Sequence, residues 1–219
     1  MHELIQQVLN WYFGLLEQIG LWGVVLLMAL ESTIVPIPSE LIVPPAAYLG
    51  HQPEGVNWVH AALVVLAGTV GSYIGSAATY GVCKAVGRPI VLRYGKYVLI
   101  GPDKLQMAEA WVQRYGAGGI FFARLLPVVR HLISIPAGIV GMDFKQFSVM
   151  TTLGAGIWCV VLTAFGLVMS DDIAAVLHGG VESEGYKLAF RKLTIVVVVA
   201  VGVLGALYVA VVKRQAKAA

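Results

Sequence analysis

The sequence is poor in charge. Only 12% of its 219 residues are Asp, Glu, Lys or Arg, whereas 58% are apolar. A typical soluble domain carries about 25% charged residues, so this chain would have no way to cover its apolar surface in water. No linker rich in proline, serine or charge divides it. We therefore expect one membrane domain and an all-α membrane protein.

Cysteines and runs of basic residues are equally scarce. Cys83 and Cys159 both lie in apolar stretches, which indicates two small buried side chains rather than a disulfide. No cluster of Cys and His has metal-ligand spacing, and Lys and Arg do not form the runs typical of nucleic-acid binding. We expect no metal, no cofactor and no nucleic-acid partner.

The N-terminus lacks the positive region and the cleavage site of a signal peptide. Residues 2–19 instead alternate apolar and polar side chains with helical periodicity. This pattern predicts an amphipathic helix that lies in the membrane interface, as a separate segment over residues 1–19.

Three apolar stretches are long enough to cross a bilayer, at 59–82, 147–169 and 193–212. Each has about 20 or more residues, which matches a hydrocarbon core of about 30 Å at about 1.5 Å per residue.

A further apolar stretch is broken in the middle. Residues 21–30 and 41–50 are apolar arms of half-bilayer length, and two carboxylates and two prolines stand between them. Proline removes a backbone donor and stops a helix. Pro36 and Pro38 therefore predict a re-entrant hairpin, with Glu31 and Glu40 at its turn. Such backbone is tolerated at depth only where protein or a water-filled cavity surrounds it.

A second broken stretch has the same order of features with the opposite charge. Its arms are 117–123 and 135–141, and Arg124, Arg130 and His131 lie between them. Pro127 and Pro136 are its expected hairpin-breaking residues.

The two broken stretches are related in sequence. PAAYLG at 45–50 aligns with PAGIVG at 136–141, and Gly68 matches Gly154 further along. Each half then consists of a lead-in helix, a hairpin and a spanning helix, which is the pattern of transporters built from repeats. The predicted boundaries are a domain over 20–170, a first repeat at about 20–82, a second at about 103–169, and a final segment, 171–219, with an outer loop, the last span and a basic tail.

Basic residues predict the orientation. They concentrate in the 83–115 loop and in the tail, whereas the 170–190 loop is acidic. The positive-inside rule then places the 83–115 loop and the C-terminus in the cytoplasm. With three spans, the two hairpins enter from opposite sides, which makes the repeat inverted. Within the loop, 103–115 has one apolar face and predicts a second interfacial helix.

Four charges fall at membrane depth, namely Glu31, Glu40, Arg124 and Arg130. Each costs about 2.5–3.5 kcal/mol at the centre of a lone helix, so each must face a cavity, pair or lose its charge. One interpretation is that the acids pair with the arginines and lock the hairpins together. The other is a binding site, in which arginines hold phosphate oxygens and desolvated carboxylates exchange protons. His131 is a candidate donor, although a plain polar loop residue is the better interpretation.

Gly71 and Gly75 form a small-residue face on the first span. Close helix packing is the favoured interpretation. A homodimer packed through such faces is an alternative, because the same faces also pack within one chain.

These residues together resemble the DedA family of bacterial membrane proteins, which shares a domain with eukaryotic lipid scramblases. The resemblance covers about residues 20–170. It rests on Glu31 followed by the PIPSE run to Glu40, on the Gly71 and Gly75 pair, and on FARLLP and Arg130 followed by IPAG.

The resemblance implies two facing hairpins in the bacterial cytoplasmic (inner) membrane that move lipid-linked phosphates, with protons as a coupling ion. Undecaprenyl phosphate, the recycled carrier of wall polymers, is the implied substrate, and phosphatidylethanolamine is the substrate of some members. The family's acidic pair matches Glu31 and Glu40, and its arginine pair matches Arg124 and Arg130. Some members carry Asp where this chain has Glu40, which leaves the substrate open.

Three other functions remain open from the residues. A proton-coupled transporter of a small ion or drug would use the same site without needing a lateral opening to lipid. A lipid phosphatase would need a nucleophilic His with an acid, and His131 is the sole histidine among the membrane charges. A structural or assembly role is the third. We expect a transporter rather than an enzyme.

Overall fold

The computed structural model describes residues 14, 18–33, 39–49, 51–52, 55–95, 102–126 and 129–168. The predicted third span and the basic tail lie outside these residues. So do Pro36, Pro38 and Pro127, and all of the predicted N-terminal interfacial helix except residues 14, 18 and 19. The division of the chain at 19 and 170 stays a prediction.

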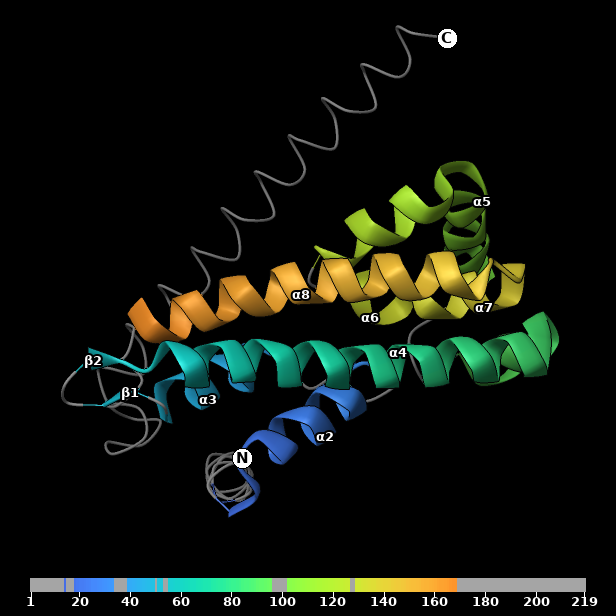
Figure 1. Cartoon of the computed structure of the whole chain (residues 1–219). Coiled ribbons are helices and arrows are strands. Elements are labelled where there is room, and N and C mark those ends of the chain that lie inside the picture. The colour runs from blue at the N-terminus through green and yellow to red at the C-terminus, as the bar shows by residue number, and fades with distance from the viewer. Residues whose placement is uncertain are drawn as a thin grey trace, which may run out of the picture.

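Two long apolar helices form the centre of the molecule. They are α4 (Trp58–Gly95) and α8 (Phe144–Val168). The apolar stretches, 32 residues in Trp58–Pro89 and 25 residues in Phe144–Val168, extend for about 48 and 38 Å, enough to cross a bilayer. Figure 1 shows the two helices side by side along their length. Tyr73 on α4 donates a hydrogen bond to Ser148 on α8 (3.2 Å).

Helix α4 continues past the predicted end of the first span, so the expectation of a loop from residue 83 was wrong. The helix changes direction at Gly87, which has a φ of 70° that favours glycine. Lys84 and Arg88 lie on this extension with exposed side chains. Charge at the membrane surface thus marks the end of the apolar stretch without ending the helix.

Each broken stretch contains three helical segments. The first has α2 (Leu21–Glu31), the 3-10 helix η1 (Ser39–Leu41) and α3 (Val43–Leu49). The second has α5 (Pro102–Arg124), α6 (Val129–Leu132) and α7 (Ser134–Val140).

Two details of the second broken stretch were not predicted. Helix α5 combines the predicted interfacial helix with the lead-in arm, and it is interrupted at Gly116 (φ 51°). Pro136 does not break the hairpin. It lies in the first turn of α7, where a proline removes no helical hydrogen bond.

The short helices are exchanged between the two long ones. Helix α2 packs against α4, the long helix of its own half, whereas α3 packs mainly against α8 and also touches α4. In the second half α5 packs against its own α8, and α7 packs against α4. Figure 1 shows α2 along the free side of α4 and α5 along the free side of α8. Each long helix is therefore covered by one helix from each half.

Glycines allow these contacts to be close. A Cβ on Gly75 would lie 2.9 Å from the carbonyl carbon of Ala29 in α2, and a Cβ on Gly166 would lie 2.7 Å from Cα of Pro44 in α3. Gly71 also faces α2. The glycine pair on α4 therefore packs within the chain, which leaves this face covered rather than open to a second copy.

A small antiparallel pair of strands lies between α3 and α4 in the chain. Strand β1 (His51–Gln52) pairs with β2 (Gly55–Val56). Gly55 has a φ of 130°, which only glycine adopts without strain. The pair closes the chain tightly between α3 and α4.

Candidate substrate site

An ion pair joins the two broken stretches. Arg130 in α6 donates through Nη2 to Oε1 of Glu31, the last residue of α2. The two side chains are almost fully buried, with exposed fractions of 6% and 1% for the residues. His131 Nε2 lies 3.8 Å from the same oxygen. An acid from the first broken stretch thus meets the bases of the second, which is one of the two arrangements that the charge pattern left open.

Ser39 connects this pair to the long helix α8. Its backbone N–H donates to Glu31 Oε1 (3.1 Å), and its Oγ accepts from Arg130 Nη2 (2.5 Å). The same Oγ accepts from Trp158 Nε1 (3.3 Å). The ring of Trp158 faces the Arg130 guanidinium, 5.3 Å from Cζ to the ring centroid, within the range of a cation–π interaction.

Arg124 has a different environment. It ends α5, is 3% exposed, and donates through Nη2 to Ser134 Oγ (2.6 Å). In the described part of the chain no carboxylate oxygen lies within 4.0 Å of it, and its buried Nε has no acceptor. The carboxylate of Glu31 is already paired with Arg130. The site therefore has a buried guanidinium without an anionic partner.

Hydroxyl groups surround the second oxygen of Glu31. Ser32 donates to Glu31 Oε2 (3.4 Å) and shares a hydrogen bond with Ser72 of α4 (2.9 Å). Thr79, about two turns further along α4, donates to the backbone oxygen of Ser32 at 3.5 Å. The two carboxylate oxygens thus face different chemistry, cationic donors on one side and neutral hydroxyls on the other.

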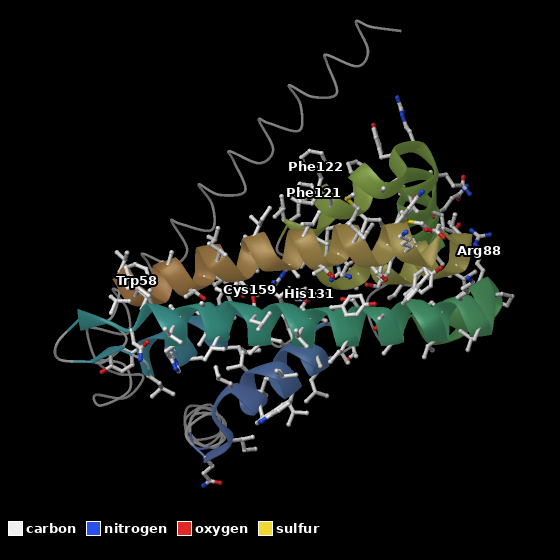
Figure 2. All side chains as sticks on the ribbon, in the orientation of Figure 1. Trp58, Arg88, Phe121, Phe122, His131 and Cys159 are labelled. Carbon is white, nitrogen blue, oxygen red and sulfur yellow. The ribbon has the colours of Figure 1, made fainter. Side chains whose placement is uncertain are left out.

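A small polar cavity lies between these groups. It offers about 10 Å³ to a water-sized sphere, which is about the room one water needs. Ser72 and Trp158 each lie near the middle of their apolar helices, and Figure 2 shows His131 between Trp58 and Arg88, which lie near opposite ends of the apolar stretch of α4. The site therefore lies near the middle of the two long apolar helices. The lining residues are Glu31, Ser32, Ser72, Arg124, Arg130, His131 and Ala155.

Four of the predicted site residues come together here, namely Glu31, Arg124, Arg130 and His131. Glu40 does not line the cavity. It lies on η1, partly buried, where its charge repels that of Glu31. The structure therefore separates the two acids, which the sequence analysis had assigned one role.

Sequence reasoning missed several residues of the site. Ser39, Ser72 and Ser134 gave no signal, because single serines are common in membrane helices. Trp158 could have been found, since a tryptophan in mid-span needs an acceptor for its N–H.

Other predictions about side chains concern groups outside the cavity. Cys83 and Cys159 are free and buried, as the sequence predicted. Within the described residues, no group of three or more His, Cys, Asp or Glu side chains is placed to hold a metal ion.

Comparison with known proteins identifies relatives over most of the chain. Residues 37–168 match the model of the VTT domain. The chain is 37% identical to undecaprenyl phosphate transporter A of Bacillus subtilis, over 79% of this chain and 83% of that protein. It is 28% identical to the protein of the same name in Staphylococcus aureus, over 75% of this chain and 81% of that one.

One relative carries a different kind of name. An alkaline phosphatase-like protein of Lactococcus lactis subsp. cremoris is 34% identical, over 81% of each chain. No solved structure matches the chain.

Proposed function

The chain belongs to the VTT-domain family, the DedA family of bacterial membrane proteins, and from this premise we propose that it carries a lipid-linked phosphate across the cytoplasmic membrane. Undecaprenyl phosphate is the proposed substrate, as the names of two relatives suggest. Arg124 and Arg130, with His131, bind the phosphate, and the prenyl tail remains in lipid.

The observation that carries this proposal is the unpaired Arg124. A buried charge without a partner is strongly unfavourable. Glu31 neutralises the charge of Arg130, whereas the almost fully buried guanidinium of Arg124 keeps its own charge. The cavity therefore has an excess of positive charge. A phosphate monoester supplies the missing negative charge, and two of its oxygens can accept from the planar fork of donors that a guanidinium presents.

The size of the cavity supports a transport cycle with an opening step. Space for about one water cannot hold a phosphate, so this conformation is a closed one. The exchanged packing of α3 and α7 supports the inverted repeat of two re-entrant hairpins, which would open the site to each side in turn. With this orientation the C-terminus is cytoplasmic.

We further propose that protons are coupled to transport. Glu31 lies in the site and Glu40 beside it, so a change in charge at either carboxylate alters the attraction of the site for an anion. Glu31 is the carboxylate in direct contact with an arginine, and Glu40 acts on it through repulsion.

The test is reconstitution in liposomes, with flipping of labelled undecaprenyl phosphate measured with and without a pH gradient. We expect flipping by the wild type and its loss in Arg124→Ala. Arg114→Ala is the matched control, because Arg114 lies on the same helix with an exposed side chain. Wild-type flux from folded Arg124→Ala would overturn the role of Arg124 in the proposal.

The same liposomes test the second candidates. Phosphatidylethanolamine replaces the prenyl phosphate in a parallel assay, and flipping of that lipid alone would shift the substrate to a phospholipid. The name of the Lactococcus lactis relative calls for a further measurement. Release of inorganic phosphate from the lipid by the purified protein would establish an enzyme, whereas flipping of intact lipid supports a carrier.

A further inference from the structure

The position of Glu31 Oε1 has the chemistry of an anion site. Two donors converge on this single oxygen, namely Arg130 Nη2 and the backbone N–H of Ser39 (3.1 Å), and His131 Nε2 lies 3.8 Å from it. A guanidinium and a backbone N–H converging on one point are the groups that bind phosphate oxygens in proteins. In this conformation the position is filled by the protein's own carboxylate.

The other side of the cavity lacks such an occupant. Arg124 is held at Nη2 by Ser134, and its buried Nε, like that of Arg130, has no acceptor among the described residues. Unlike Arg130, Arg124 has no carboxylate of the described residues within 4.0 Å. Both arginines line the same cavity. A phosphate that reached both would therefore find one arginine available and the other occupied by Glu31.

We propose that Glu31 is an internal competitor of the substrate, its Oε1 holding the place that a phosphate oxygen takes when the lipid binds. This inference rests on the proposed function and specifies how the site opens to its ligand. Binding is then an exchange of anions on Arg130. The lipid phosphate replaces the carboxylate of Glu31 on Arg130. The backbone N–H of Ser39, which donates to Glu31 in this conformation, then donates to the phosphate.

The exchange has a consequence for Glu31. Once displaced, it loses its contact with Arg130 and faces the phosphate, a second anion. The charged and titratable groups around it are Arg130 and His131 from α6, Arg124 from α5 and Glu40 from η1. On its α4 side, Ser32 at the end of α2 donates to Glu31 Oε2 (3.4 Å) and shares a hydrogen bond with Ser72 of α4 (2.9 Å). Both of these groups are neutral hydroxyls.

A displaced carboxylate in this environment takes up a proton, because the anion that replaces it repels its charge. An O–H bond forms on Oε2 with a proton from solution, next to the Ser32 hydroxyl. No bond of the phosphate forms or breaks. Substrate and proton therefore bind together, and they leave together when Glu31 returns to Arg130.

The test is the equilibrium binding of undecaprenyl phosphate to detergent-purified protein. We expect Glu31→Gln to bind the lipid roughly tenfold or more tightly than the wild type, because removing a competing state raises the apparent affinity. Net flux through the variant should fall, since no carboxylate remains to displace the phosphate. Glu109→Gln is the matched control, because Glu109 is ion-paired with Arg88 outside the site (3.2 Å), and its affinity should not change.

A second measurement needs no variant. At about pH 8 the phosphate has already lost both its protons. Uptake of about one proton when the lipid binds to the wild type, measured with an indicator dye, is therefore protonation of the protein. Equal or weaker binding by folded Glu31→Gln, or binding without proton uptake, overturns the inference and leaves the carrier function standing. Absence of binding by the wild type overturns both.

Discussion

The two halves of the molecule use one plan with different chemistry. In each, a lead-in helix ends on a buried charged residue, Glu31 in the first half and Arg124 in the second. In each, a short helix follows the break and crosses to the other half's long helix. The first half contributes a carboxylate and serines to the cavity, whereas the second contributes two arginines and a histidine. The same order of helices thus places a carboxylate on one side of the cavity and arginines on the other.

The two arginines show how far this division goes. Arg130 is bound by three groups from the rest of the site, whereas Arg124 is held by one serine of its own half. We infer that Arg130 joins the halves and binds substrate, and that Arg124 serves mainly the substrate.

The largest expected effect separates these two roles. Arg130→Ala leaves the carboxylate of Glu31 buried without its partner, a change that typically costs about 3–5 kcal/mol. Arg124→Ala removes a charge that has no carboxylate partner among the described residues and one hydrogen bond to Ser134, so its effect on stability should be smaller. Unfolding in detergent, followed by helical circular dichroism, measures both. Equal losses of stability would show that the two arginines are structurally equivalent.

The next prediction compares one glycine from each half. Gly75→Ala would press a Cβ against the backbone of Ala29, and overpacking of this kind costs about 1–3 kcal/mol. Gly154→Ala would place its Cβ 2.6 Å from Cβ of Arg124, so it should displace that side chain and reduce flux more than stability.

Gly81→Ala is the control for both glycines, because nothing lies within 4 Å of its new Cβ. Unfolding and liposome flux are measured for the three variants. Gly75→Ala should lower stability and flux in parallel. If Gly154→Ala does the same, its loss of flux does not come from a displaced Arg124 side chain.

The smallest effect is expected at Trp158. Trp158→Phe keeps an aromatic face for Arg130 but removes the N–H that binds Ser39, a loss of about 0.5–1.5 kcal/mol. Trp158→Leu removes the face as well and should reduce lipid affinity further. Binding of undecaprenyl phosphate to the two variants checks the order, and equal affinities would exclude a contribution of the ring to Arg130.

Much of this arrangement follows from the sequence. In lipid, a charged residue at the end of an apolar half-helix must face a cavity or have a partner. Glu31 and Arg130 are such residues, and they meet each other. The helical arms also fall close to their predicted bounds, because apolar runs interrupted by proline leave little choice of structure.

What the sequence could not predict depends on the exact path of the backbone. Ser39 and Glu40 are neighbours, yet Ser39 reaches the arginine and Glu40 does not line the cavity. Only the turn of η1 decides which of the two faces inward. The length of α4 was also missed, because exposed Lys84 and Arg88 are compatible with either a helix or a loop.

The exchange of α3 and α7 between the long helices bears on how the chain is made. A ribosome delivers α4 long before α7, so one face of α4 has no protein partner while the second half is still being synthesised. Two units that exchange arms are arranged as in a domain-swapped pair, here connected by the chain between α4 and α5. Neither half completes its packing alone, and the candidate site can first exist when α6, α7 and α8 have all entered the membrane.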